Sequence, residues 1–245
     1  MTININSLKK NFGDKTAVDI PEFSILSGDM LGLVGNNGAG KTTLFRLLLD
    51  LIKADEGEVS LQVSAEDGTD GETTIIKPAE SEAWKDFTGA YIDEGFLIDF
   101  LSPEEFFEFI GKTYGMDKAA VEARINDFTA FMGGEIIGQK KLIRNLSAGN
   151  KQKVGIIAAL FNRPRLVILD EPFNFLDPSS QNILKKLLTE YHEETRATIL
   201  ISSHNLQHTT EISSRIALME HGSIIKDLAN DYQAAEAELA TYFNV

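Results

Sequence analysis

The sequence predicts an α/β fold organised around a parallel β-sheet, with a group of helices inserted into it. Three features of the chain support this prediction. An apolar strand passes through a glycine-rich loop into an apolar helix at 31–44. Residues 166–169 form an uninterrupted apolar run, as expected for a parallel strand that is covered on both faces. Amphipathic helices near 103–132 interrupt the alternation of strands and helices.

The loop at 35–42 has the residues of a phosphate-binding loop. Gly35 is followed after four residues by Gly40, Lys41 and Thr42, which is the P-loop spacing. Glycines allow the backbone to curl so that its N–H groups face phosphate oxygens, and the next helix adds its positive end. Lys41 can place a cation between the β- and γ-phosphates, and Thr42 offers a hydroxyl to Mg²⁺. The alternative is a glycine-rich turn that only joins strand to helix.

The remaining elements follow from periodicity. Alternation predicts strands at 3–8, within 17–25 and at 59–63, and the helix after the loop is expected to end near Ile52. The polar segment 64–82 predicts a hairpin or a loop. Later strands are expected at 198–201, 216–219 and 223–226, the last two as a hairpin. Further helices are expected at 150–162, from Pro178 onward and at 231–243.

Two helices are expected between 102 and 134. Ser102 is the predicted N-cap of the first, Pro103 its first residue and Glu105 the acid of a capping box. The second helix occupies about 118–132 and ends at Gly133-Gly134. Because no strand separates these helices, they predict a helical subdomain.

Composition narrows the function. The 245 residues carry a formal net charge of −14, which argues against nonspecific binding to nucleic acid or attachment to anionic lipid through a basic patch. The chain has no cysteine, so disulfides and thiolate metal sites are excluded. Its N-terminus lacks the basic start and apolar run of a signal peptide. The longest apolar runs are too short to span a bilayer, so no direct membrane insertion is expected.

Two carboxylates follow the apolar run at 166–169. A parallel strand brings Asp170 and Glu171 to the carboxyl edge of the sheet, beside the predicted phosphate loop. Asp170 can belong to the Mg²⁺ shell, and Glu171 can orient and polarise an attacking water. Alone, the pair is equally well explained as solvated acids that end a strand. Together with the phosphate loop, it predicts a nucleotide site.

With these motifs, the chain resembles the ATP-binding subunit of an ABC transporter. Five further stretches carry the resemblance in the family's order, and the match spans about residues 3–226. They are a signature-like loop at Leu146–Lys153, a D-loop-like Asn174–Pro178, a switch histidine in Ser203-His204-Asn205, Phe12 at the position of an adenine-stacking aromatic, and Tyr91–Glu94 at the Q-loop position.

The resemblance implies a P-loop NTPase of the ABC-ATPase fold, with a mostly parallel core sheet, an antiparallel β subdomain and an inserted α-helical subdomain. The chain is then a single ABC ATPase domain. Its catalytic core and β subdomain are expected at 1–90 and 163–227, its helical subdomain at about 95–162 and a tail helix at 228–245. The lack of an appended regulatory domain favours the exporter type.

The same resemblance implies ATP and Mg²⁺ and assigns roles to residues. Lys41, Glu171 and His204 are the catalytic candidates, and Thr42, Asp170 and Glu94 the candidate metal ligands. The candidate nucleotide contacts are Phe12, Asn36, Asn37, Gly38, Ala39, Gly40, Lys41, Thr42, Thr43, Ser147, Gly149 and Asp177. In the family the signature residues act across a head-to-tail dimer, formed with a second copy or a paired ABC subunit, with two ATP molecules between the chains.

Simpler roles remain open for three of these residues. Ser147 is also expected to be an ordinary N-cap, which is compatible with anion binding. Asp177 directly precedes Pro178, so its position is explained equally well by a role as a helix cap and by a role as a bridge across the dimer. A lone histidine is more often a surface residue, and only its motif favours a role for His204.

Two positions depart from the family pattern. The signature has Ala148 and Asn150 where glycine and glutamine are usual. A methyl group at 148 is unfavourable only if that residue needs a positive φ, and we expect it to be tolerated. The Q-loop position holds Glu94, with Asp93 as the alternative. A carboxylate can still ligate Mg²⁺, but its charge beside a triphosphate is expected to change metal dependence or affinity.

The favoured function is an ATP-hydrolysing subunit that powers a membrane ABC transporter. It would lie on the cytoplasmic face of the membrane, bound to a separate transmembrane permease. Phe96, Leu97 and Phe107 are the candidates for the exposed surface that receives this partner. The alternatives are a soluble ABC ATPase with a cytosolic assembly partner, or a hydrolysis-deficient subunit of an asymmetric pair. The complete set of catalytic residues argues against the latter.

Overall fold

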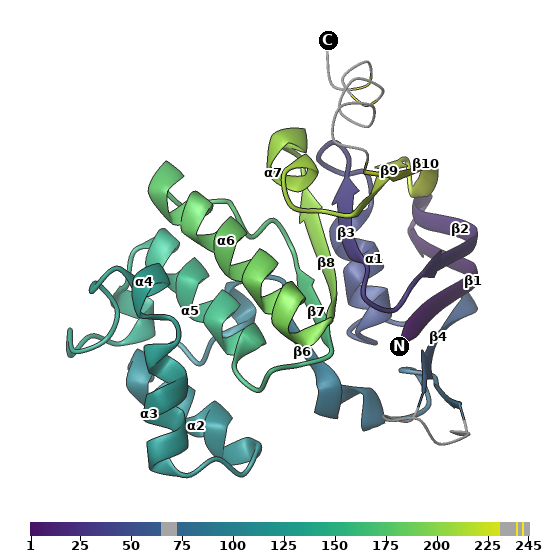
Figure 1. The fold of residues 1–245 in the computed structure, drawn as a ribbon. Coiled ribbons are helices and arrows are strands. Elements are labelled where there is room, and N and C mark those ends of the chain that lie inside the picture. The colour runs from purple at the N-terminus through teal and green to yellow at the C-terminus, as the bar shows by residue number, and fades with distance from the viewer. Residues whose placement is uncertain (65–72, 231–238, 240–241, 243–245) are drawn as a thin grey trace.

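The computed structural model of the chain describes residues 1–64, 73–230, 239 and 242. Its strands form two sheets, and most of its helices gather on one side of the larger sheet (Figure 1).

The larger sheet has six strands in the order β10-β9-β3-β8-β7-β6. Its parallel strands are β3 (Met30–Val34), β6 (Thr88–Tyr91), β7 (Leu166–Leu169), β8 (Thr198–Ser203) and β9 (Arg215–Glu220). At one edge β10 (Ser223–Ala229) pairs antiparallel with β9, which forms the hairpin predicted there. The expected core sheet of mostly parallel strands is therefore confirmed.

The smaller sheet is antiparallel throughout, in the order β2-β1-β4-β5. It consists of β1 (Thr2–Phe12), β2 (Lys15–Ile25), β4 (Glu56–Val63) and β5 (Thr74–Ile76). The expected antiparallel β subdomain is thus present. Of the two alternatives for 64–82 the hairpin is correct, since β5 pairs with β4, while 65–72 lie outside the described residues.

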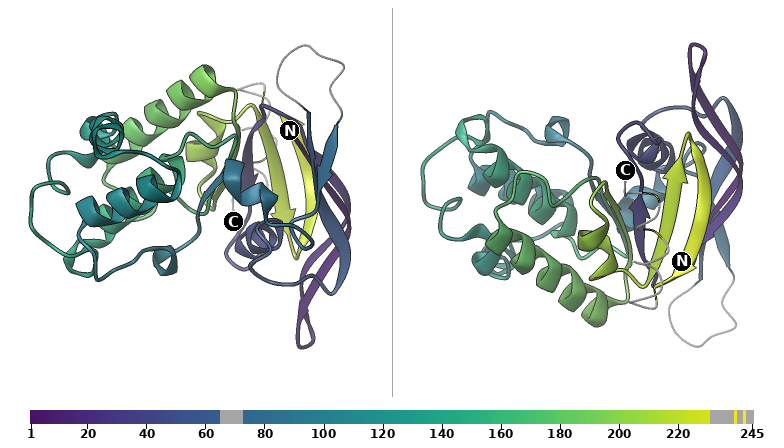
Figure 2. Two further views of the ribbon diagram at one scale, coloured as in Figure 1. Left: turned by 90° about the horizontal axis from the view of Figure 1, so that it is seen from below. Right: turned by 90° about the horizontal axis from the view of Figure 1, so that it is seen from above.

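Strand β7 accounts for the uninterrupted apolar run. Leu166 and Ile168 pack into a core with α1 (Lys41–Leu48) and the smaller sheet, whereas Val167 and Leu169 pack into a core with α5 (Ala148–Leu160) and α6 (Pro178–Thr195). Side chains alternate between the two faces of a strand, so a sheet covered on both faces needs apolar residues at every position. Figure 2 shows α1 between the two sheets and the larger group of helices on the opposite face.

The helices between β6 and β7 form one group. They are η2 (Glu94–Phe96), α2 (Pro103–Thr113), α3 (Lys118–Asn126), α4 (Thr129–Met132), η3 (Ile143–Asn145) and α5. The predicted capping box of α2 is confirmed, because Ser102 Oγ accepts from the Glu105 N–H at 3.2 Å and Glu105 Oε2 accepts from the Ser102 N–H at 2.8 Å. Gly133 ends α4 in a left-handed conformation, as expected from the sequence.

The single helix expected at 118–132 is wrong, because α3 and α4 are separate helices. Phe128 lies at the break, as the N-cap of α4, and is buried in the core together with Phe131 and Met132. The guanidinium of Arg124 lies 4.7 Å from the centre of the Phe128 ring and donates to main-chain carbonyls at the end of α5. Contacts with a distant helix therefore override the local helical periodicity.

Other boundaries also differ from expectation. Helix α1 ends at Leu48 rather than near Ile52, and Asp50 then adopts a left-handed φ of 48°. The short elements η1 (Ala83–Phe87), β6 and α7 (Leu206–Thr210) were not predicted, because each is too short for a periodic pattern. β10 extends to Ala229, three residues beyond the strand expected at 223–226. Most of the helix expected at 231–243 lies outside the described residues.

We predict that Gly89→Ala lowers the free energy of unfolding by about 1–3 kcal/mol. A Cβ atom at Gly89 in β6 would lie 1.8 Å from the carbonyl oxygen of Ala159 in α5, so strand and helix would have to move apart. Urea denaturation measures the effect.

The matched control is Thr88→Val at the preceding position of the strand. Within the part of the chain that the structure describes, the buried Thr88 hydroxyl has no hydrogen-bond partner. An isosteric methyl should therefore leave stability unchanged or raise it. A Gly89→Ala variant as stable as this control would contradict the proposed steric conflict.

Candidate functional site

The loop between β3 and α1 is shaped by glycines. Gly38 and Gly40 have φ angles of 83° and 113°, which side chains other than glycine rarely adopt. A Cβ atom at Gly40 would also lie 2.3 Å from the Ala17 carbonyl oxygen in β2. The helix then begins at Lys41, as predicted, so its positive N-terminal end points at the loop.

Lys41 is a buried cation in this loop. Its Nζ donates to the Gly35 carbonyl at 2.6 Å and lies 3.4 Å from Glu171 Oε1. A buried ammonium is stable only when it is paired, and here a carbonyl and a carboxylate provide the pairing. The positive charge is therefore held where the loop and the Glu171 side chain meet.

Thr42 and Asp170 also meet. Thr42 Oγ1 donates to Asp170 Oδ2 at 2.5 Å, and Ser202 Oγ donates to the other carboxylate oxygen. Burial raises the pKa of Asp170, and the hydrogen bonds from Ser202 and Thr42 oppose this shift. Hydroxyl and carboxylate oxygens are ligands that Mg²⁺ prefers, so the pair fits this ion, with phosphate oxygens and water completing its shell. In the described ranges, no cluster of three histidine, aspartate or glutamate side chains offers another metal site.

Sequence reasoning missed Ser202 and Gln152. In the sheet Leu169 of β7 is opposite Ile201 of β8, so Asp170 and Ser202 follow at the same edge. The available signal was a pair of serines directly after the apolar run of β8. Buried Gln152 of α5 donates its amide to the Glu171 carbonyl at 3.2 Å, a contact for which the sequence offered no signal.

Glu171 is held in a strained position. Its φ is 46°, in the left-handed region that costs a residue with a side chain about 1–3 kcal/mol. Its backbone N–H donates to Ser202 Oγ at 2.8 Å, and its Oε2 lies 2.8 Å from His204 Nδ1. The structure thus joins the three catalytic candidates, since the Glu171 carboxylate contacts Lys41 on one side and His204 on the other.

The candidate nucleotide contacts divide between neighbouring hollows. Phe12 at the end of β1 is half exposed and lines a hollow of about 270 Å³ together with Lys15, Ala17, residues 37–43 and Glu171. Asn36 lines an adjacent hollow with Met219 and His221, and residues 37–39 line both hollows. The structure therefore brings Phe12 to the phosphate loop, whereas Asn36 does not line the hollow that Phe12 lines.

Glu94 lines a third cleft, which it shares with Thr42, Asp170 and Glu171. Its carboxylate accepts a hydrogen bond from Lys151 of α5 at 2.9 Å. The alternative Q-loop acid, Asp93, accepts from Arg46 of α1 and from the Gly95 N–H. Glu94 therefore lies on the metal side of the site, but Lys151 binds it.

Ser147, Gly149 and Asp177 lie apart from these hollows. Among the described residues, none of the three lines either the Phe12 hollow or the Glu94 cleft. Ser147 is the N-cap of α5, and Asp177 caps α6 through hydrogen bonds, chiefly with Ser180, that lower the pKa of Asp177. Both helix caps expected from the sequence are thus present.

The substitution at 148 is accommodated. Ala148 is the first residue of α5 and has no positive φ, so its methyl group causes no strain, as expected. Gly149 has a stricter requirement, because a Cβ atom there would lie 2.6 Å from the Phe175 carbonyl oxygen. The signature-like loop and the loop at 174–177 therefore touch within one chain.

The docking surface expected at Phe96, Leu97 and Phe107 is partly wrong. Phe107 and Leu97 are buried, and Phe107 stacks on Phe161 with ring centres 5.4 Å apart. Phe96 is exposed, and it lines an apolar groove of about 280 Å³ with Phe109 and Tyr114, which are exposed as well. Helix α2 turns Phe109, rather than Phe107, to the surface because Phe107 fills the core between α2 and α5.

A family model described as ABC transporter matches residues 18–174, well over half of the chain. The chain belongs to the ABC transporter family. A tungstate uptake system ATP-binding protein of Peptoclostridium acidaminophilum is 30% identical over 227 residues, which cover 91% of this chain and 97% of that protein. A bacitracin transport ATP-binding protein of Bacillus licheniformis is 30% identical over 236 residues, which cover 94% of this chain and 70% of that protein.

Solved structures agree in fold. An ATP-binding subunit of an ABC transporter superposes with a TM-score of 0.81 at 23% identity, over all of both chains. A dimeric ATP-binding cassette in a post-hydrolysis state with ADP and Pi has a TM-score of 0.77 at 20% identity, and the match covers 93% of this chain and 98% of that one. This member of the family is an ABC ATPase, the ATP-binding subunit of a transporter. No helix in the described part of this ATPase is both long and apolar enough to cross a bilayer.

Proposed function

We propose that this ABC ATPase hydrolyses ATP with Mg²⁺ and thereby powers a membrane transporter as one half of a head-to-tail dimer. The observation that carries the proposal is the contact of Glu171 with both Lys41 and His204, beside the Thr42–Asp170 pair. A buried cation, a carboxylate with a fixed orientation and two hard oxygen donors then converge on one phosphate loop.

Each of these residues has a task in the proposed reaction. Loop N–H groups, the start of α1 and Lys41 bind the phosphates, and Phe12 packs on the adenine. Thr42 and Asp170 hold Mg²⁺, which when bound neutralises phosphate charge, and Glu94 is a third candidate ligand. Glu171 orients the attacking water and takes its proton, while His204 holds the Glu171 carboxylate in place.

In the proposed dimer, each chain contributes residues to the nucleotide site of the other chain. Ser147, Gly149 and Asp177 lie outside the hollow that Phe12 and the phosphate loop line, so we propose that they act on the nucleotide of a second copy or paired ABC subunit. ATP then favours the closed dimer, because both chains contact its phosphates, and hydrolysis removes that preference. We propose that two parts of the chain move relative to each other in this cycle. The catalytic part comprises 1–90 and 163–227, and the helical part comprises about 95–162.

The groove with Phe96, Phe109 and Tyr114 is the proposed docking site for a separate transmembrane permease. Exposed aromatic side chains around a groove are typical of a surface that binds a partner helix. Such docking would place the ATPase on the cytoplasmic face of the membrane, and the net charge of −14 argues against nucleic acid as the partner. One similar protein is named for uptake and another for bacitracin transport, so similarity alone favours no direction of transport.

Phosphate release by the purified chain tests this proposal. We expect turnover with ATP and Mg²⁺ and none when EDTA removes the metal. Because the active species is a dimer, turnover per chain should rise with protein concentration. Tight ATP binding without turnover at any concentration would contradict autonomous hydrolysis, and turnover that persists in EDTA would contradict the metal assignment.

A further inference from the structure

The two acids at the Q-loop position are held by opposite parts of the molecule. Asp93 pairs with Arg46 of α1, the helix that follows the phosphate loop, at 2.9 Å. Glu94 pairs with Lys151 of α5, the helix that Ser147 caps, at 2.9 Å. One dipeptide therefore connects the helix that starts at the phosphate loop with the helix that starts at the signature-like loop.

Lys151 is the more fixed member of its pair. Its side chain is 20% exposed, whereas that of Glu94 is 56% exposed. Its backbone N–H donates to the Ser147 carbonyl at 2.9 Å in the first turn of α5. An anchored cation loses less side-chain entropy on pairing than two freely moving partners would, so Lys151 can determine where the Glu94 carboxylate lies.

Most of the charged side chains that line the cleft near Glu94 are acidic, and this explains why the pairing with Lys151 matters. Four acids line it, namely Asp93, Glu94, Asp170 and Glu171. Arg46 forms an ion pair with Asp93, and Lys41 forms one with Glu171. Thr42 and Ser202 donate hydrogen bonds to Asp170. Lys151 forms the ion pair with Glu94. Without Lys151, the Glu94 carboxylate would add an uncompensated negative charge beside the triphosphate.

We propose that Lys151 is a positioning residue of the ATP site, which acts by holding the Glu94 carboxylate against α5. The proposal rests on the ATP and Mg²⁺ site proposed above. Lys151 and Mg²⁺ then compete for the same carboxylate, so the lysine sets how strongly Glu94 supports the metal. It also explains how an acid is tolerated at a position where the family has a neutral glutamine.

The test is a cycle of four full-length chains: wild type, Lys151→Met, Glu94→Gln and the double variant. Binding of a fluorescent ATP analogue is titrated against Mg²⁺. In Lys151→Met we expect metal-free binding to weaken about two- to fivefold, and the half-saturating Mg²⁺ concentration to fall by a similar factor. In the Glu94→Gln background, Lys151→Met should change neither quantity, because the neutral amide needs no counter-charge.

Lys112→Met is the matched control, since Lys112 pairs with Glu108 at 2.7 Å on α2 and neither residue lines the cleft. It should behave as wild type. Equal effects of Lys151→Met in both backgrounds, or no effect in either, would overturn the proposal.

Urea unfolding of the same four chains without nucleotide provides a second measurement. Non-additive effects of Lys151→Met and Glu94→Gln support the pair, and strict additivity overturns it. If wild type binds no nucleotide, the proposed function fails and this inference fails with it. If wild type binds the Mg²⁺ complex but the two substitutions show no coupling, only the inference about Lys151 fails.

Discussion

Replacing Lys41 with alanine is expected to weaken ATP binding roughly 100-fold. The Lys41 ammonium is the buried cation of the loop, and it lies 3.4 Å from the Glu171 carboxylate. Its removal deprives the phosphates of a charge-assisted hydrogen bond and leaves Glu171 facing them with its charge uncompensated. Equilibrium binding of a fluorescent ATP analogue in the presence of Mg²⁺ measures the loss.

Lys186→Ala is the control for this variant, since Lys186 is an exposed lysine of α6 whose loss should leave affinity unchanged. Thermal unfolding establishes that the Lys41→Ala chain is folded. A folded Lys41→Ala variant that binds ATP as tightly as wild type would contradict the role proposed for the phosphate loop.

Glu171→Gln is expected to reduce phosphate release about 10²–10⁴-fold while ATP binding persists. The amide cannot take a proton from water, but it keeps the size of the side chain and can still hydrogen-bond to His204. Because ATP is then bound but not consumed, the variant should accumulate as a dimer. Phosphate release and light scattering with ATP and Mg²⁺ measure the two effects.

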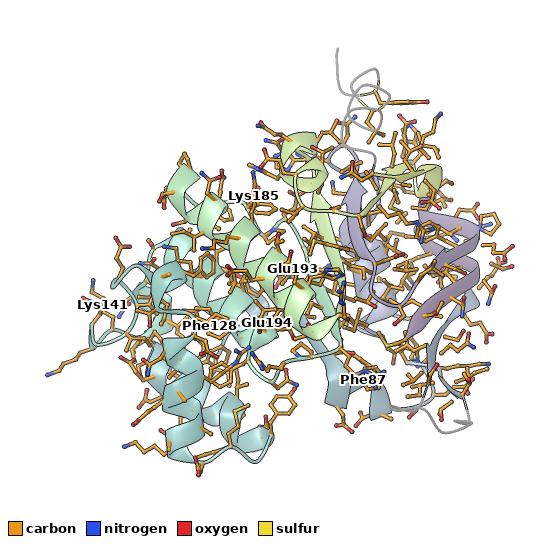
Figure 3. The ribbon with its side chains drawn as sticks, in the orientation of Figure 1. Phe87, Phe128, Lys141, Lys185, Glu193 and Glu194 are labelled. Carbon is orange, nitrogen blue, oxygen red and sulfur yellow. The ribbon has the colours of Figure 1, made fainter. Side chains whose placement is uncertain are left out.

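Glu193→Gln makes the same chemical change on the surface of α6, away from the phosphate loop (Figure 3). It should hydrolyse ATP as wild type does and show no added dimer. A Glu171→Gln chain that stays monomeric and turns over normally would refute the role of Glu171 as the base.

The candidate site was largely predictable where its residues are close together in the sequence. The glycine loop runs directly into α1, so spacing alone predicted where Lys41 and Thr42 lie. The apolar run of β7 predicted that Asp170 and Glu171 end a buried parallel strand. The N-caps Ser102, Ser147 and Asp177 were predictable for the same reason, because a cap bonds to residues two or three positions along the chain.

Contacts between distant segments were not predictable in this way. Ser202 reaches Asp170 because β8 lies beside β7, and Lys151 reaches Glu94 because α5 packs near η2. The same is true of Phe107, whose helical spacing left both a buried and an exposed position open until Phe161 was placed against it.

The sequence by itself determined the α/β class, the phosphate loop, the order of the motifs and most helix starts. Only the tertiary structure decided which acids are paired, which phenylalanines are exposed and where the helix at 118–132 breaks. The physical reason is the range of the interactions. Caps, turns and periodic faces arise from residues a few positions apart, whereas charge pairing and packing depend on which elements the fold brings side by side.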